Sequence, residues 1–272
     1  MGCDQISNHQ LLEQPVKISM KTILKLIILP VLHIVREIIT VLLRHAIPSP
    51  SVPTPPPTPY PVAYDFYSEV EMRNCYDHFK QYFSDAIFLD TYRLREYAIN
   101  EAISNHHPDY HYLEFGVRNG ISLNQFSEIL KAIQIYGFDS FEGFKEDWKG
   151  VSGVPKGSFS LHGQIPKLNN NCVPVVGWIQ ETLPTFISDN RDLKINFMHI
   201  DTDTYPTAKF ILQQTKPYLL NDSIIVFDEL YNHVGWRVGE YKALTELFDE
   251  EEYEFLVFSR HDAQAVIQYK KL

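Results

Sequence analysis

Apolar positions between residues 110 and 250 follow two alternating spacings. Short runs of consecutive apolar residues, typical of strands buried on both faces, alternate with longer segments whose apolar residues recur every third and fourth position, as in amphipathic helices. The strands are expected at residues 111–115, 134–138, 173–176, 195–200 and 223–227. The helices are expected at residues 120–132, 179–188, 205–215 and 239–249. This alternation predicts an α/β fold, in which helices cover both faces of a parallel sheet.

The pattern changes at both ends of this α/β region. Residues 253–259 and 263–270 have the alternation of two strands joined by a turn, which predicts an antiparallel hairpin closing one edge of the sheet. Residues 64–83 and 91–105 have helical spacing and precede the first strand, where they could cover the mouth of a substrate site or cap the sheet. Residues 62–272 are therefore predicted to form one mostly parallel α/β domain.

The first 61 residues differ from this domain in composition. Residues 1–20 form a tail with little pattern, and residues 46–61 are rich in proline. Because proline lacks an amide hydrogen and has a fixed φ, we expect a semi-rigid linker in the proline-rich segment. Residues 21–45 gather their charged side chains, mostly basic, on one side of a helix and Leu, Ile and Val on the other, with Pro30 as a hinge.

The amphipathic helix expected over residues 21–45 allows two interpretations. A wide apolar face with a basic polar stripe suits a helix that lies in a membrane surface. The same pattern suits a helix that packs on the domain or on a second subunit of a homo-oligomer. The charge-free run from Leu26 to Val35 is too short to span a bilayer. The sequence therefore leaves peripheral membrane contact and protein contact open.

Composition limits the classes of partner and of compartment. The 272 residues include 34 acidic and 24 basic side chains, and the net charge of −10 argues against a nucleic-acid partner held through its phosphates. Cys3, Cys75 and Cys172 lie far apart and form no C-x-x-C motif, so neither a disulfide framework nor a zinc site is indicated. This cysteine usage suits a reducing compartment. We expect a cytoplasmic protein, either free or at the cytoplasmic membrane surface.

A strand, a glycine turn and the start of a helix follow one another from Tyr112 to Ser122. Such a unit brings backbone N–H groups and a helix N-terminus close to a ligand, and Gly116 and Gly120 let the backbone approach it. The spacing is E-x-G-x-x-x-G-x-S, with Glu114 at the strand end. The G-x-G-x-x-G fingerprint of dinucleotide-binding folds is absent. An acidic residue here suits a ligand with a cationic amine better than a pyrophosphate.

Acidic residues follow four of the five predicted parallel strands. They are Glu114, Asp139, Asp201 and the pair Asp228 and Glu229. Because the carboxyl ends of parallel strands meet at one edge of a sheet, these side chains are expected to converge where α/β folds bind ligands. Asp139 follows Glu114 by 25 residues, which is close to the spacing of the acid that reaches ribose hydroxyls. Asp201, Asp228 and Glu229 supply oxygen ligands that suit Mg²⁺ or Mn²⁺.

Four sequence blocks give these features the order and spacing of a known family. The blocks are residues 113–122, 137–143, 177–184, and 199–205 together with 227–229. The pattern resembles class I S-adenosylmethionine-dependent methyltransferases, and it is similar in particular to the macrocin and mycinamicin type of O-methyltransferase. The resemblance implies a Rossmann-like methyltransferase domain over residues 62–272. It also implies S-adenosylmethionine as cofactor and a hydroxyl of a small molecule, such as a sugar or secondary metabolite, as methyl acceptor.

The resemblance assigns roles to individual residues. The turn after the first strand would hold the methionine end of the cofactor, Asp139 its ribose, and the residues after the third strand its adenine. The implied cofactor-binding residues are Glu114, Phe115, Gly116, Val117, Asn119, Gly120, Ser122, Asp139, Ser140, Phe141, Gly177, Trp178 and Asp201. Asp201, Asp228 and Glu229 match the metal-binding positions of the metal-dependent members, where a cation such as Mg²⁺ acidifies the acceptor hydroxyl.

The chain departs from the family pattern at three positions. Arg118 stands where many class I methyltransferases have a third glycine, Glu229 where the macrolide enzymes often have aspartate, and Thr204 where the catechol-type enzymes have lysine. The general base is therefore unassigned, and His233 and His261 are candidates because a histidine near neutral pKa suits proton abstraction. The alternative to an enzyme is a membrane-tethered module that binds the cofactor or a nucleotide without catalysis.

Three further expectations concern the surroundings of this site. The segment from Lys145 to Asn171, which contains several glycines, is expected to be a mobile lid over the acceptor. Asp203 lies close to Asp201 in the chain and could instead cap the helix that begins near residue 205. His199, which lies inside the fourth strand, is expected to have a structural role.

Overall fold

The computed structural model describes residues 62–148 and 154–272, together with Leu29, Val31, Leu32 and Val35. Contacts divide the chain into two compact units, Met1–Tyr60 and Pro61–Leu272. In the first unit, the four described residues are helical and exposed. The remainder of the helix predicted over residues 21–45, the tail and the proline-rich linker lie outside the described residues, so these predictions stay untested. Among the described helices, none is both long and apolar enough to cross a bilayer.

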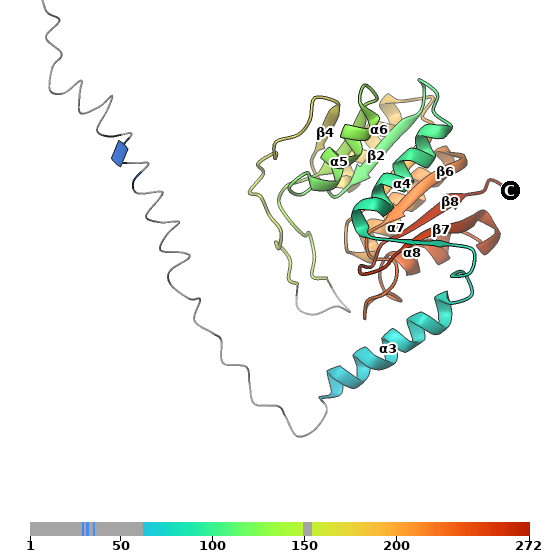
Figure 1. Cartoon of the computed structure of the whole chain (residues 1–272). Coiled ribbons are helices and arrows are strands. Elements are labelled where there is room, and N and C mark those ends of the chain that lie inside the picture. Colours follow the sequence, from blue (N-terminus) through green and yellow to red (C-terminus); the bar gives the residue numbers. More distant parts are fainter. Residues whose placement is uncertain (1–28, 30, 33–34, 36–61, 149–153) are drawn as a thin grey trace, which may run out of the picture. The chain divides into compact units, whose positions relative to one another are not determined.

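A sheet of eight strands forms the centre of the second unit (Figure 1). The strands lie in the order β1-β7-β8-β6-β5-β2-β3-β4. Their bounds are β1 Ile87–Leu89, β2 His111–Phe115, β3 Ile135–Asp139, β4 Cys172–Val176, β5 Ile195–Ile200, β6 Leu219–Phe227, β7 Tyr253–Ser259 and β8 Ala265–Tyr269. The neighbours β6-β5-β2-β3-β4 are parallel, whereas β8 runs antiparallel to both β6 and β7. The predicted Rossmann-like sheet with its C-terminal antiparallel hairpin is confirmed.

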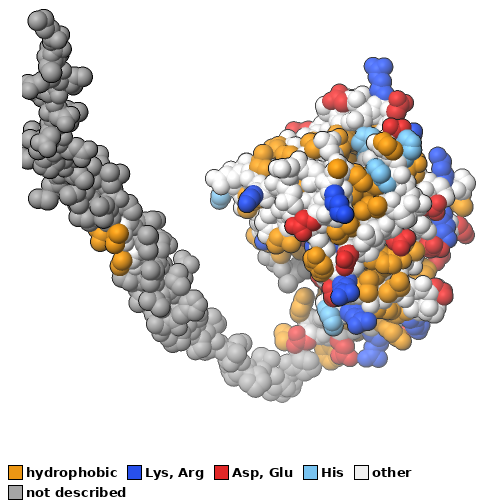
Figure 2. Space-filling view, turned by 45° about the horizontal axis from the view of Figure 1, so that its top comes forward, with side chains coloured by type: hydrophobic (Ala, Val, Ile, Leu, Met, Phe, Trp, Pro, Cys, Tyr) orange, Lys and Arg blue, Asp and Glu red, His pale blue; other side chains and the backbone are white. Residues whose placement is uncertain are grey.

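Helices cover both faces of this sheet, and two apolar clusters hold them there (Figure 1). The helices are α3 Ala63–Phe79, α4 Thr91–Ser104, α5 Ile121–Leu130, α6 Ile179–Asp189, α7 Tyr205–Thr215 and α8 Glu240–Leu247. Buried side chains of α4 and α5 join one cluster, and those of α6, α7 and α8 join the other. Helix α3 buries Cys75 and Phe79 near its C-terminal end, and Glu71 pairs with Arg237 at 3.2 Å. On the face of the second unit shown in Figure 2, charged side chains of both signs are interspersed.

Strand β1 is an element that the sequence pattern did not predict. Its three residues pair in parallel with β7, from Ile87 opposite Val257 to Leu89 opposite Ser259. A run of three residues is too short for a period of two to be recognised against its surroundings. The prediction that the hairpin of β7 and β8 closes one edge of the sheet is therefore wrong in this detail, because β1 pairs with β7 and is itself the edge strand.

Strand register brings the predicted site residues to one edge of the sheet. Phe115 pairs with Phe138 on one side and with Ile200 on the other, and Ile200 pairs with Phe227. The residues that follow these positions are therefore level with one another. They are Gly116, Asp139, Asp201 and Asp228. Strand β5 is buried along its whole length, which fixes this register through apolar packing.

Candidate active site

A cavity of about 420 Å³ lies at the carboxyl ends of the central strands. Most of the residues that the sequence assigned to the cofactor line it. They are Gly116, Val117, Asn119, Ser122, Asp139, Ser140, Trp178 and Asp201. The other assigned residues lie outside the lining and are Glu114, Phe115, Gly120, Phe141 and Gly177. The three residues assigned to a metal, Asp201, Asp228 and Glu229, all line the same cavity.

The turn between β2 and α5 requires glycine because of a close backbone approach. Gly116 has a φ of +91°, and a Cβ at this position would lie 1.7 Å from the carbonyl oxygen of Asp201. The next glycine, Gly120, has a φ of +77° and is the N-cap of α5. The chain can therefore pass directly against the end of β5, so that Ile121 and Ser122 in the first turn of α5 reach the cavity wall.

Asp139 holds this turn through backbone hydrogen bonds. The N–H groups of Val117 and Arg118 donate to its Oδ2 atom at 2.8 and 2.7 Å, and the N–H group of Phe141 donates to Oδ1 at 2.7 Å. A carboxylate has about four acceptor positions, so these bonds leave room for a ligand hydroxyl. The carboxylate thus joins the turn after β2 to the segment after β3 and still lines the cavity.

Glu114 is fully buried beneath the turn rather than exposed on the cavity wall. The Ser122 hydroxyl donates a hydrogen bond to its Oε1 atom at 2.7 Å. Its Oε2 atom lies 3.6 Å from Nδ1 of His199. In the structure, Glu114 braces the first turn of α5 through Ser122 and does not line the cavity. A direct contact with the cofactor amine stays a prediction.

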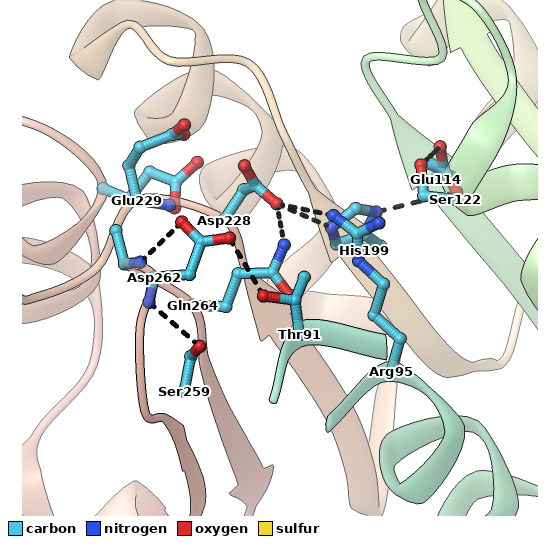
Figure 3. A network of polar contacts seen from close by, with 12 residues as sticks. Thr91, Arg95, Glu114, Ser122, His199, Asp228, Glu229, Ser259, Asp262 and Gln264 are labelled. Atoms are coloured by element: carbon cyan, nitrogen blue, oxygen red, sulfur yellow. Dashed lines mark hydrogen bonds and ion pairs between the residues drawn. The ribbon is translucent and has the colours of Figure 1, made fainter. Parts of the chain in front are cut away.

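His199 connects Glu114 with Asp228 across the sheet (Figure 3). Its ring is fully buried, and its Nε2 atom lies 3.5 Å from Oδ1 of Asp228. Burial by itself lowers the pKa of the imidazole, but hydrogen bonding and charge from Asp228 and Glu114 outweigh burial and raise the pKa of His199 to about 9. His199 is therefore a buried cation between two carboxylates, and its structural role includes the charge balance of the site.

Asp228 is held by side chains from distant parts of the chain (Figure 3). Arg95 of α4 donates to its Oδ1 atom at 3.0 Å, and Gln264, which precedes β8, donates to the same oxygen. Burial favours the neutral acid, but His199 and Arg95 outweigh it and lower the pKa of Asp228 to about 2. Asp228 is thus ionised at neutral pH. No pattern in the sequence marks Arg95 or Gln264 as residues of the site.

The neighbouring acids have the opposite electrostatic behaviour. Burial, followed by the charge of Asp228, raises the pKa of Asp201 and Glu229 well above the usual range and that of Asp203 to about 7. The helix N-cap next to Asp203 is Thr204, and Asp203 lines the cavity instead. Burial thus disfavours the ionised form of each of these acids, and repulsion between the neighbouring carboxylates adds to it.

The oxygen atoms of this acidic cluster are close enough to share one ion. Asp201, Asp203 and Glu229 each offer an atom within 4.8 Å of the others. His199, Asp201 and Asp228 form a second such group. Oε2 of Glu229 is buried and has no hydrogen-bond partner among the described residues. Several hard oxygen donors with one unsatisfied buried oxygen fit a small divalent cation such as Mg²⁺ or Mn²⁺.

The two histidines predicted as general bases do not line the cavity. Nε2 of His233 lies 3.1 Å from the carbonyl oxygen of Glu229, and its Nδ1 accepts a hydrogen bond from the N–H group of Gly235. Burial lowers the pKa of His233. His261 is exposed in the turn between β7 and β8. A catalytic role of either histidine stays a prediction.

Comparison with known proteins agrees with this geometry. Residues 113–230 match the family described as methyltransferase domain. The crystal structure of CalS11, a calicheamicin methyltransferase, is 21% identical with a TM-score of 0.56, and the match covers 79% of this chain and 88% of that chain. The apo structure of CalS11, described as a TDP-rhamnose 3′-O-methyltransferase, is 21% identical with a TM-score of 0.50, covering 79% and 89%.

No curated protein matches the chain. The likeness to the CalS11 structures extends over most of each chain and shows the same fold, with the mostly parallel sheet. The match to the methyltransferase domain begins in β2 and ends just after β6, so it spans every strand end that contributes to the cavity. Residues 113–230 are therefore similar to the methyltransferase-domain family, and the chain shares the fold of the CalS11 methyltransferase structures.

Proposed function

We propose that this protein transfers a methyl group from S-adenosylmethionine to a hydroxyl group of a small molecule, with a divalent cation held by carboxylates after β5 and β6. One observation carries the proposal. A single cavity is lined both by the glycine turn with Asp139 and by the acidic cluster with Asp201 and Asp228. A cofactor site and an oxygen-rich cation site that share one cavity suit methyl transfer to an acidified hydroxyl.

The cofactor would lie along the ends of β2, β3 and β4. The turn from Gly116 to Ser122 supplies backbone groups for its methionine end, and Asp139 is the acid at the ribose position. Trp178, which precedes α6, supplies an aromatic wall for the adenine. Asp201 and Asp228, which line the same cavity, would then lie beside the cofactor that supplies the methyl group.

The acidic cluster would hold the cation beside the acceptor. A bound cation stabilises the alkoxide that the acceptor hydroxyl forms when it loses its proton. Arg95, Gln264 and His199 hold Asp228 in place, and His199 and Arg95 keep it ionised. Asp203 lines the cavity, whereas His233 does not, so Asp203 is the better-placed group to accept the proton.

The acceptor would be a sugar or a related hydroxylated metabolite. Phe144, Trp148 and Phe159 line the cavity, and the Phe144 ring contacts the other two, with its centroid 5.1 Å from that of Phe159 at an interplanar angle of 90°. Aromatic rings supply a large and rigid apolar surface for a ring-shaped ligand. The structurally similar CalS11 is described as a TDP-rhamnose 3′-O-methyltransferase, which agrees with a sugar acceptor.

Calorimetry with S-adenosylhomocysteine tests the cofactor claim on the full chain. We expect the wild-type protein to bind it, and Asp139→Ala to weaken binding by about tenfold or more, because three charge-assisted hydrogen bonds are lost. Asp192→Ala is a matched control, since Asp192 is an exposed acid outside the cavity. Absence of binding by the wild-type protein would refute the proposed function.

Methyl transfer itself is tested with labelled S-adenosylmethionine and a panel of hydroxylated sugars, with and without a chelator. We expect label in the ether product and loss of the activity when the chelator removes the cation. Activity that survives the chelator would leave the methyltransferase proposal intact and rule out a required metal. Binding of the cofactor without turnover on any acceptor would favour a non-catalytic module.

A further inference from the structure

The rim of the cavity carries two cations that the proposed chemistry does not use. Three basic residues line the cavity, namely Arg95, Arg118 and Lys145. Arg95 is paired with Asp228 at 3.0 Å. In the part of the chain that the structure describes, the side chains of Arg118 and Lys145 have no carboxylate within 4.0 Å and donate no hydrogen bond. Each of them instead lies over an aromatic ring of the same cavity.

Arg118 is directed to the rim by the turn that carries it. Its φ is +47°, a left-handed conformation that is uncommon for a residue other than glycine, and its N–H group is fixed on Asp139. Its guanidinium carbon lies 4.2 Å from the ring centroid of Phe159. A guanidinium that stacks on a ring through its face keeps the N–H groups of its edge available. Those groups match a carboxylate or phosphate in two-point contact.

Lys145 reaches the same cavity from a different element. It lies in the segment after β3, and its Nζ atom is 5.2 Å from the ring centroid of Trp178. Lys145 and Arg118 are both exposed, so a ligand in the cavity can reach them. Their aromatic supports, Trp178 and Phe159, also belong to the lining. The two cations therefore line one cavity, each beside a different aromatic ring.

Charge is distributed unevenly over this cavity. Asp201, Asp203, Asp228 and Glu229 line it at the ends of β5 and β6. Arg118 and Lys145 line it beside the ends of β2 and β3. Arg118 acts on the acidic cluster through its charge, which lowers the pKa of Asp203, but among the described residues neither Arg118 nor Lys145 forms an ion pair. The hydroxyls of a neutral sugar can accept hydrogen bonds from such groups, but only an anionic ligand also neutralises their charge. In a chain with a net charge of −10, two such groups at one opening indicate a ligand that carries negative charge.

We propose that Arg118 and Lys145 form an anion subsite at the rim of the cavity, which binds a phosphate or carboxylate group of a small molecule lying in the cavity. The inference deepens the proposed function and rests on it, because it names a chemical class for the ligand of that site. Two sources supply this chemistry. One is an anionic acceptor, such as a phosphorylated sugar, and the other is the carboxylate of the cofactor.

Inorganic pyrophosphate is the probe for an acceptor anion. It is titrated by calorimetry into the full chain, free of metal, with and without saturating S-adenosylhomocysteine. We expect binding to the wild-type protein, and a loss of about tenfold or more in each of Arg118→Gln and Lys145→Met, because each removes a charge-assisted contact. Arg191→Gln and Lys156→Met are matched controls, since both residues are exposed and lie outside the lining.

A pair of cofactor probes separates the two sources. S-adenosylhomocysteine carries the carboxylate, and its decarboxylated analogue keeps the amine without it. If Arg118→Gln weakens the binding of only the compound with the carboxylate, the subsite binds the cofactor. If both compounds bind as in the wild type while the binding of pyrophosphate is weakened, the subsite binds the acceptor.

The subsite is refuted if pyrophosphate does not bind the wild-type protein and neither variant changes the affinity for S-adenosylhomocysteine. The titration without S-adenosylhomocysteine keeps this result separate from failure of the proposed function. A wild-type protein that binds pyrophosphate at Arg118 and Lys145, but no cofactor, would contradict the methyltransferase proposal and leave the anion subsite standing.

Discussion

Two carboxylates of the same cavity are held in opposite ways. Asp139 accepts hydrogen bonds from three backbone N–H groups at 2.7 to 2.8 Å, all within the turns that follow β2 and β3. Asp228 accepts from the side chains of Arg95 and Gln264 and lies 3.5 Å from His199. In the proposed site, the carboxylate at the cofactor end is thus held by backbone groups (the backbone-held end), and the carboxylate at the cation end is held by side chains, two of which carry charge (the side-chain-held end).

This difference determines which parts of the fold keep each carboxylate oriented. Backbone donors come with the glycine turn itself, so Asp139 stays oriented as long as β2 and β3 keep their register. The donors of Asp228 come from α4, from β5 and from the residue before β8, and two of them carry charge. Loss of one partner there leaves a buried charge unpaired, which costs more than loss of a neutral hydrogen bond.

The largest effect is expected for Asp228→Ala, which removes the shared partner of two cations. The substitution leaves Arg95 and His199 without their carboxylate, so we expect the free energy of unfolding to fall by about 3 kcal/mol. Mn²⁺ binding should be lost, whereas the affinity for S-adenosylhomocysteine should change little. Urea denaturation, electron paramagnetic resonance of Mn²⁺ and calorimetry measure the three quantities.

Asp192→Ala serves as the control for Asp228→Ala, because it removes an exposed acid outside the cavity. The contrast between the two ends predicts the reverse result for Asp139→Ala. This substitution should weaken the binding of S-adenosylhomocysteine and leave the binding of Mn²⁺ unchanged. If Asp228→Ala weakens both ligands equally, the two carboxylates do not serve separate ends of the cavity.

The backbone-held end could be predicted from the sequence because its signals are local. The spacing of Glu114, Gly116 and Gly120 indicates the turn, and Asp139 directly follows an apolar run. The side-chain-held end could be predicted only in part. Asp228 follows a strand in the same way, but its donors Arg95 and Gln264 lie 133 and 36 residues away. No periodicity links residues at such distances, so their pairing depends on the strand order.

Histidines show the same limit. His233 and His261 were predicted as bases because they follow strand β6 or lie in the hairpin, but the direction of a side chain in a turn is not encoded in its position along the chain. His199 carried a usable signal. It is the one ionisable residue of β5, in which Asn196 is the other polar residue, and β5 lies beside β2, which contains Glu114. A polar side chain in such a strand has to find a polar partner.

A smaller effect is expected for His199→Gln, which keeps a polar side chain but removes the buried positive charge. A glutamine amide cannot donate to Glu114 and Asp228 with the geometry of the imidazole, so we expect Mn²⁺ affinity to fall by about tenfold. The affinity for S-adenosylhomocysteine should fall less, because Ser122 still holds Glu114. His107→Gln, in an exposed loop, is the control.

A result in which His199→Gln leaves Mn²⁺ binding unchanged would show that Arg95 and Gln264 suffice to orient Asp228. The carboxylate of Asp228 would then need only the two side chains that donate hydrogen bonds to it. Equal weakening of both ligands would instead indicate a general loss of packing around β5, which a parallel measurement of the unfolding midpoint would reveal.

The last predicted effect is a pH dependence of stability. It should show whether the titrating acids belong to the side-chain-held end or to the backbone-held end. The pKa of Asp203 is about 7 in the folded protein against an ordinary value of 3.8, so the folded state binds a proton that the unfolded state releases between these values. Stability of the metal-free protein should therefore fall as pH rises from about 4 to 7. Asp201 and Glu229, whose pKa values are also raised, act in the same direction. His199 extends the fall from about 6.5 to 9, because its positive charge is lost there.

Calorimetric unfolding of the metal-free protein at pH 5 and pH 7.5 should show a midpoint lower by roughly 5–10 °C at the higher pH. A carboxyl with a pKa of about 7 loses about 2.5 kcal/mol over this range, and about 1 kcal/mol corresponds to roughly 2–4 °C in a domain of this size. Asp203→Asn should flatten this slope, because the amide does not titrate. Saturating Mn²⁺ should flatten or reverse it, because a cation favours the ionised carboxylates. Saturating S-adenosylhomocysteine should raise both midpoints and leave the slope in place. A slope that responds to S-adenosylhomocysteine and not to Mn²⁺ would mean that the titrating acids belong to the backbone-held end.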